Sequence, residues 1–392
     1  MNIEHPLRAM FAAQAKLELW SLPLGPGRWN VLFGGEEPTL LLPAGDYRLQ
    51  QRCLSYFVPG VWKRLYGQAL LSVNAALPAA GLLPELHLAE GAQSFLPARL
   101  PIARSSCSAV QIGTAGPRQK ASVLPVTESR EALAIAKIAM VPGADHQVTA
   151  EAGWLTELEG VPELEGQMPR LMAEGVAPTS RRYLVATAAP NTRSTGQFTR
   201  AHAAFLGALA RVRQDVMSFT ASPCFEYLEQ TLVRLKPHLT RNERTILQAV
   251  LGDCRSLLAG WTGPFVTAHG DFAPWNIRLH RDRLFVFNWE CARAGANPLT
   301  DLLNYFVMPR ARSHRMPGPR FLAAAMSRVE DIARQIYPEW IWRSRVVSAL
   351  ALVYLLEVLL HQAMASKSLV RTHPVIEGYL RLMEQRWAWM AA

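Results

Sequence analysis

The pattern of apolar and polar positions divides the chain into segments with different predicted secondary structure. Two apolar runs flank a Gly-Gly-Glu-Glu-Pro segment within residues 29–46 and predict a hairpin. Residues 60–78 repeat apolar positions at helical spacing and end at a proline, so they predict a helix. Residues 107–126 predict two short strands around a glycine-containing turn, and further strands are predicted at 131–140 and 181–190. With a helix starting at residue 151, this part of the chain predicts a small antiparallel sheet with one helix packed on it.

Helical periodicity dominates after residue 191. Thr199 has the position of an N-cap for the helix that follows it, and residues 242–261 predict a second helix. Short strands and a loop interrupt the pattern before it becomes helical again from Asp301. The most apolar run, Val346–Leu360, is shorter than the roughly 20 residues that a bilayer requires and contains Glu357. It therefore predicts a buried core helix, and no transmembrane segment is expected.

Length and composition restrict the class of protein. A chain of 392 residues, half of them apolar, is long enough for two or three packed units with a large core. Its net charge of +10 favours anionic partners over cationic ones. The arginines are dispersed and no basic run contains interleaved aromatic residues, so no nucleic-acid partner is expected. The five scattered cysteines include no CxxC pair, which favours a reducing compartment and a cytoplasmic location.

Three motifs in the second half of the chain carry the chemistry. The first is HGDFAPWN at residues 269–276, the second is FNWE at 287–290 after an apolar segment, and the third is GANPLTDL at 295–302. In this order and spacing they resemble the catalytic loop and metal loop of the aminoglycoside phosphotransferase/choline kinase family, relatives of the protein kinases. The resemblance covers roughly residues 106–310 well and the remaining helices loosely.

The resemblance implies an α+β, bilobal protein-kinase-like fold. Residues 106–190 would form the N-lobe, a small antiparallel sheet plus a helix. Residues 191–392 would form a larger, mainly helical C-lobe with the catalytic loop at 269–276 and the metal loop at 287–290. Residues 1–105 lie outside the resemblance and are expected to be an accessory N-terminal region: a substrate lid, an oligomerisation unit or a module that binds a protein partner.

The resemblance also implies an activity, phosphoryl transfer from ATP (or GTP) to a hydroxyl group with the help of Mg²⁺. Asp271 would take or orient the proton of the acceptor hydroxyl, and Asn276 would offer a side-chain oxygen to the metal. His269 would order the loop by hydrogen bonding, and Asp301 would brace it from behind.

A lysine in an apolar strand is the expected partner of the nucleotide phosphates. Lys137 stands in LAIAKIAM, where a charge is costly unless it is paired. The resemblance places it on the α- and β-phosphates, paired with Glu151 or, as an alternative, with Glu157. The other interpretations are a surface lysine at a sheet edge, and for Glu151 a favourable acid in the first turn of a helix.

Two glycines complete the expected nucleotide site. Gly113 and Gly116 would form a turn over the phosphates, where backbone N–H groups can approach closely, although an ordinary hairpin has the same pattern. The whole interpretation requires that Lys137, Asp271 and Asn276 face one cavity.

One residue departs from the family pattern. Asn288 stands where the family has an aspartate, so a neutral amide replaces the main negative charge on the magnesium. The expected metal ligands are then Asn276, Asn288 and Glu290, with Glu290 taking over the missing charge. The alternatives are a nucleotide-binding pseudokinase or scaffold with little turnover, and a substitution introduced to trap a complex.

The charge of the C-terminal region bears on the acceptor. Residues 302–392 contain six acidic residues against twelve Arg and Lys, which is a poor environment for a polycation. The sequence therefore predicts a neutral or anionic, sugar-like or glycan acceptor rather than an aminoglycoside antibiotic.

Overall fold

The computed structural model describes most of the chain, and its described residues fall into two compact units. Unit 1 comprises Met1–Glu159 and Met168–Arg193, and unit 2 comprises Gly160–Gln167 and Ser194–Ala392. The described residues are 27–33, 39–58, 61–76, 83, 85–88, 107–126, 131–132, 134–190, 192, 196–280, 282–313, 318–366, 369 and 373–390. The expected turn at residues 34–38 lies outside them.

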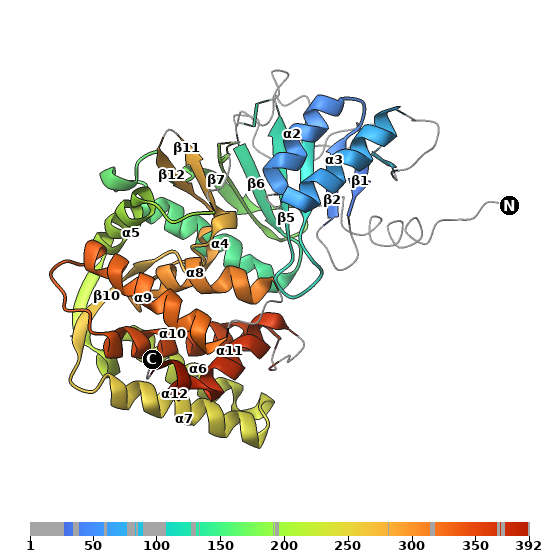
Figure 1. The fold of residues 1–392 in the computed structure, drawn as a ribbon. Helices are drawn as coiled ribbons and strands as arrows, with labels where there is room; N and C mark the ends of the chain where they lie inside the picture. The colour runs from blue at the N-terminus through green and yellow to red at the C-terminus, as the bar shows by residue number, and fades with distance from the viewer. Residues whose placement is uncertain are drawn as a thin grey trace. The chain divides into compact units, whose positions relative to one another are not determined.

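Unit 1 is built on an eight-stranded antiparallel sheet with the strand order β3-β1-β2-β4-β5-β6-β8-β7 (Figure 1). Its strands are β1 (Gly27–Leu32), β2 (Thr39–Pro43), β3 (Glu85–Leu88), β4 (Cys107–Ile112), β5 (Lys120–Val126), β6 (Ala134–Ala139), β7 (Leu171–Val176) and β8 (Arg182–Thr187). The predicted antiparallel sheet is confirmed, and the hairpin expected at 29–46 is β1 with β2. The sheet is larger than expected because three strands from the first hundred residues extend it beyond β4.

Alternating residues of the strands enter two separate cores, as the two-residue period of a strand requires. Leu40 and Leu42 of β2 belong to a cluster that includes Leu54 and Phe57 of helix α2 (Tyr47–Phe57). Leu41 belongs to the cluster on the other face of the sheet. Helix α3 (Val61–Ala76) confirms the helix predicted at 60–78, whereas α2 was not predicted.

Helix α4 (Pro142–Leu158) packs against β6, β7 and β8. The prediction that a helix starts at residue 151 is wrong, because the helix begins nine residues earlier at a proline in its first turn. Its first turns contain few apolar residues, so periodicity alone does not reveal them. Glu151 consequently lies in the middle of the helix, and its interpretation as an acid of the first turn is wrong.

Unit 2 is mainly helical, which together with unit 1 confirms the α+β class. Its helices are α5 (Arg200–Val212), α6 (Pro223–Leu235), α7 (Arg241–Leu257), α8 (Thr300–Arg312), α9 (Pro319–Ile336), α10 (Ser344–Ser366), α11 (Pro374–Glu384) and α12 (Arg386–Met390). Its strands are β9 (Gln214–Ser218), β10 (Thr262–Ala268), β11 (Ile277–His280), β12 (Arg283–Val286) and β13 (Arg293–Ala296), in sheets of three and two strands. Thr199 caps α5 as predicted, in a reciprocal capping box with His202.

Helix α10 is the central element of unit 2 and packs against α6, α7, α8, α9, α11 and α12 (Figure 1). At 23 residues it is longer than its apolar run indicated, so the expectation that the segment is too short for a bilayer is wrong. Within the described part of the chain it is the one helix long and apolar enough to cross a membrane, but it is mostly buried inside the unit. Its Glu357 forms a 2.7 Å ion pair with Arg293 of β13. This burial is that of a core helix.

Candidate active site

The HGD motif forms a sharp loop directly after β10. Gly270 has a φ of +78°, a left-handed conformation that favours glycine. A Cβ atom at this position would lie 2.1 Å from the carbonyl oxygen of Cys291, so the loop also needs a residue without a side chain. The loop ends in a single 3₁₀ turn, Pro274–Asn276, which leads into β11.

Asp301 holds the loop from behind. The Asp301 carboxylate accepts the backbone N–H of His269 at 2.7 Å through Oδ2 and that of Gly270 at 2.9 Å through Oδ1. Burial raises the pKa of Asp301 to about 6, although both of these hydrogen bonds and the nearby Arg293 act in the opposite direction. A carboxylate with both oxygens engaged fixes the direction of two successive peptide groups.

A second set of hydrogen bonds reaches the loop from the helices of unit 2. The Asn304 amide on α8 donates to the carbonyl of Gly270 at 2.6 Å, and its oxygen accepts the Tyr354 hydroxyl at 2.8 Å. Tyr354 also lies 3.0 Å from the hydroxyl of Tyr379. Sequence reasoning missed these residues, although Asn304 lies one turn after Asp301 and hence on the same side of the helix.

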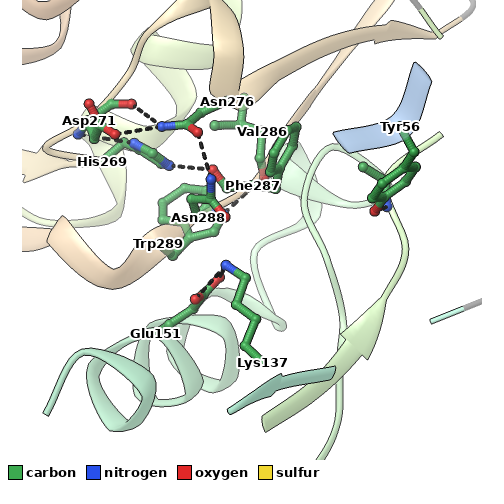
Figure 2. Close-up of polar contacts among 11 residues, drawn as sticks. Tyr56, Lys137, Glu151, His269, Asp271, Asn276, Val286, Phe287, Asn288 and Trp289 are labelled. Atoms are coloured by element: carbon green, nitrogen blue, oxygen red, sulfur yellow. Dashed lines mark hydrogen bonds and ion pairs between the residues drawn. The ribbon is translucent and has the colours of Figure 1, made fainter. Parts of the chain in front are cut away.

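His269 connects the catalytic loop with the segment before Asn288 (Figure 2). Its Nδ1 accepts the backbone N–H of Asp271 at 3.2 Å, and its Nε2 lies 3.1 Å from the carbonyl of Phe287. This pairing assigns the ring proton to Nε2. The fully buried ring also contacts Trp289 edge-on at 4.7 Å between centroids. The ring thus links two backbone segments of the candidate site.

The side chains of Asp271, Asn276 and Asn288 form one hydrogen-bonded row (Figure 2). The Asn276 amide nitrogen donates to the Asp271 carboxylate at 2.7 Å and to the Asp271 carbonyl at 2.8 Å. The Asn276 oxygen accepts the Asn288 amide at 2.7 Å. Asn288 has a left-handed backbone with φ 69° and ψ 65°, a region that Asn and Asp enter more readily than other residues with side chains.

The environment of Asp271 raises the pKa of its carboxyl to about 6. Loss of hydration is the main cause, and the charge of Glu290 adds to it, while Arg312 and hydrogen bonds from Asn276 and Trp275 oppose it. A carboxyl of this kind is ionised at pH 7 yet remains a better proton acceptor than an ordinary aspartate.

The side chains expected to hold magnesium fit that ion poorly. The amide of Asn288 directs an N–H at the Asn276 oxygen, so this oxygen already accepts a hydrogen bond in place of a cation. Only Glu290 would bring a negative charge from the metal loop, whereas magnesium prefers carboxylate and water oxygens. Among the described residues there is also no group of three or more His, Cys, Asp or Glu side chains that could hold a metal.

In unit 1, Lys137 and Glu151 form a buried ion pair (Figure 2). The ammonium group lies 2.5 and 2.7 Å from the two carboxylate oxygens, and the residues are 6% and 2% exposed. The interpretation of Lys137 as a surface lysine is therefore wrong. Glu157, the alternative partner, lies on the exposed side of α4.

The glycine turn between β4 and β5 is a hairpin anchored to the start of α4. The Gln119 side chain donates to the carbonyl of Gly113 at 2.9 Å, and nothing lies within 4 Å of a Cβ built on Gly116. A Cβ on Gly143, in the first turn of α4, would lie 2.2 Å from the carbonyl oxygen of Pro117. The turn thus packs closely on the helix that carries Glu151.

An arginine that sequence reasoning missed lies near the catalytic loop. The Arg312 guanidinium, at the end of α8, stacks over the Trp275 ring at 4.8 Å. Arg310 and Arg328 stack in the same way on Phe321 and Phe306. The described part of unit 2 shows no ion pair between these three arginines and a carboxylate, although the charge of Arg312 acts on Asp271.

The predicted site residues thus assemble into two groups. Lys137 and Glu151 are joined in unit 1, near the turn that contains Gly113 and Gly116. The residues joined in unit 2 are His269, Asp271, Asn276, Asn288 and Asp301, with Glu290 acting on the charge of Asp271. That the two groups share one cavity stays a prediction.

Comparison with known proteins identifies the family. The sequence model of the phosphotransferase enzyme family matches residues 126–336, which is more than half of the chain. The chain belongs to this family, and the resemblance inferred from its motifs is confirmed. The comparison with curated proteins gives no match.

Solved structures of small-molecule kinases are similar at low identity. A thermostable mutant of aminoglycoside phosphotransferase APH(4)-Ia in ternary complex with ADP and hygromycin B is 12% identical, with a TM-score of 0.49 and coverage of 71% of this chain and 93% of that one. The streptomycin-ATP-APH(2")-IIa complex is 14% identical, with a TM-score of 0.46 and coverage of 71% and 93%. Amicoumacin kinase hAmiN with AMP-PNP and Ca²⁺ is 12% identical, with a TM-score of 0.43 and coverage of 70% and 88%. The family assignment comes from the sequence match alone.

Proposed function

We propose that this protein transfers the γ-phosphate of ATP (or GTP) to a hydroxyl group of a small molecule in the cytoplasm. The observation that carries the proposal is the Asp271 carboxylate, held by Asn276 in a loop that Asp301 and His269 fix in place. In a member of the phosphotransferase family, this arrangement suits acceptance of the proton from an attacking hydroxyl.

The residues of each unit have separate tasks in this proposal. Asp271 orients the acceptor hydroxyl and takes its proton, and its raised pKa helps this step because the carboxylate is more basic than usual. Lys137, held by Glu151, binds the α- and β-phosphates of the nucleotide, and the turn with Gly113 and Gly116 closes over them.

The acceptor is proposed to be a neutral or anionic, sugar-like or glycan molecule. Arg312 is the foremost positive charge that acts on Asp271, and its guanidinium is not bonded to a carboxylate in the described part of unit 2. A polycationic acceptor would meet this charge next to its own reacting hydroxyl, whereas a sugar acid or sugar phosphate would be attracted by it.

The second candidate function is a nucleotide-binding pseudokinase or scaffold. The hydrogen bond between the amides of Asn288 and Asn276 favours it, because it occupies an oxygen that the family uses for the metal. Phosphoryl transfer with a weakly held metal would then be slow or absent.

One experiment separates the two functions. The wild-type chain, Asp271→Asn and Asn288→Asp are incubated with ATP, Mg²⁺ and a panel of one sugar in its neutral, amino, uronate and phosphate forms, and products are detected by mass spectrometry. Asp282→Asn is the matched control, because it makes the same substitution at an exposed aspartate in a turn. Asn tolerates the φ of 63° at this position. We expect transfer by the wild type and the control, loss of about 100-fold or more in Asp271→Asn, and a gain in Asn288→Asp.

Other outcomes decide against the proposal. If wild type and Asn288→Asp both bind ATP but transfer no phosphate, the scaffold function stands instead. If the amino form is the preferred acceptor, the proposed acceptor class is wrong.

A further inference from the structure

The face of the sheet that carries Lys137 can be identified from strand geometry. Lys137 and Ile135 are two residues apart on β6, so their side chains point to the same face. The resemblance to the phosphotransferase family implies that adenine sits against the strand at 183–190 and the linker after it, where backbone groups would recognise it. A nucleotide with its phosphates on Lys137 and its base there would lie along this face. This assignment depends on the proposed function, because it is the binding of ATP that places the base there.

The same face is covered by helix α2 of the N-terminal region. Ile135 and Ala188, the residue next to the end of β8, pack against the cluster that contains Leu54 and Phe57 of α2. Leu124 of β5 is 2% exposed in this cluster, and Leu54 is fully buried. The helix thus buries the apolar surface on which a base would stack.

The linker after β8 is also occupied by α2. The Tyr56 hydroxyl accepts the backbone N–H of Ala189 at 3.1 Å, and Tyr56 packs against the same cluster. This N–H belongs to the stretch of backbone expected to recognise a base by hydrogen bonding. The tyrosine therefore satisfies a donor that a bound base would otherwise use.

We propose that helix α2 is an intrachain cover of the base-binding surface, with Tyr56 as its latch on Ala189. The nucleotide then binds only to the fraction of molecules in which α2 has moved, and the apparent affinity falls by that fraction. A partner that binds α2 away from the sheet would therefore increase the affinity for ATP. This would give residues 1–105, which the family match does not include, a role in regulating nucleotide binding.

The variant that tests the latch is Tyr56→Phe, which keeps the ring and removes the hydroxyl. Tyr47→Phe is the matched control, since Tyr47 lies on the same helix and is 39% exposed. Among the described residues its hydroxyl bonds only to Ser72 and Gln51, within α2 and α3. A neutral hydrogen bond corresponds to a factor of about 2 to 12 in an equilibrium constant. We expect ATP to bind Tyr56→Phe tighter by roughly that factor and Tyr47→Phe as it binds the wild type.

Hydrogen exchange tests the same proposal in the unmodified chain. Saturating ATP should accelerate amide exchange in residues 47–57, because α2 must leave the face, while helix α7 of unit 2 serves as the internal reference. Leu54→Ala, which weakens the packing of α2, should also increase ATP affinity.

The outcomes distinguish this proposal from the proposed function. If ATP binds all variants equally and leaves residues 47–57 protected, the cover does not exist, although phosphoryl transfer stands. If no variant binds ATP, the proposed function is wrong and the cover has nothing to regulate.

Discussion

Replacing Asn288 with aspartate tests the row of side chains in the candidate active site. In the wild type the Asn288 amide donates to the Asn276 oxygen at 2.7 Å. An aspartate has no N–H to donate, so two oxygens would face each other at this distance. Asn276 cannot turn its amide without breaking the 2.7 and 2.8 Å hydrogen bonds to Asp271. The variant therefore loses a hydrogen bond and gains a repulsion.

The expected magnitude follows from these contacts. Loss of the hydrogen bond and the facing oxygens should lower the free energy of unfolding by about 1–3 kcal/mol in EDTA. A cation bound at the new carboxylate relieves the repulsion. At a cation concentration about 100 times its dissociation constant, binding would raise the free energy of unfolding by about 2.7 kcal/mol. Unlike the wild type, Asn288→Asp should therefore become strongly stabilised by Mg²⁺.

The assay is thermal and urea unfolding in EDTA and in Mg²⁺, without nucleotide. Asn242→Asp, which makes the same charge change at an exposed position in the first turn of α7, is the control and should be insensitive to Mg²⁺. Equal stability of Asn288→Asp and wild type in EDTA, together with equal effects of Mg²⁺ on both, would refute the hydrogen-bonded row.

Four further predictions concern Lys137, Asp301, Asp271 and Arg312. Lys137→Met breaks the buried pair with Glu151 and should cost unit 1 about 3–5 kcal/mol in urea unfolding, most of it regained in Lys137→Met/Glu151→Leu; an unchanged midpoint would contradict the pair. Asp301→Asn turns an NH₂ group towards one of two loop N–H donors and should cost about 1–3 kcal/mol; hydrogen exchange at the loop amides that stays as slow as in the wild type would contradict this bracing. Because proton transfer needs the ionised form of Asp271, whose pKa is raised to about 6, kcat/KM should rise with pH up to about 6 and then level off. Arg312→Ala removes a charge that lowers this pKa, so the rise should move to higher pH; a profile identical to that of the wild type would exclude that influence.

Much of the candidate site could be predicted because its residues come from contiguous motifs. HGDFAPWN contains both Asp271 and Asn276, and the loop between β10 and β11 is short enough that they must meet. Lys137 was predictable for a different reason, since a charge inside an apolar strand requires a partner. The family resemblance supplied Glu151 as its partner, even though the predicted start of the helix was wrong.

The remaining features depend on contacts between distant segments, which periodicity does not report. Helix α2 has mixed composition, and only its N-cap Asp46 and the spacing of Leu49, Cys53 and Leu54 indicate it. The hydrogen bond between Tyr56 and Ala189 spans 133 residues, and that between Asn304 and Tyr354 spans 50. Such pairs become visible only when the strands and helices have been placed.

The hydrogen bonds behind Gly270 have a consequence for how the protein is made. The loop is supported by Asn304, which lies 34 residues further along the chain, and Asn304 in turn by Tyr354, a further 50 residues on. On the ribosome, the HGD motif emerges long before α10 does, so these supporting hydrogen bonds must wait until α10 has been made. A gene product shortened ahead of α10 would keep every motif residue and still lack the Tyr354 hydroxyl that supports Asn304.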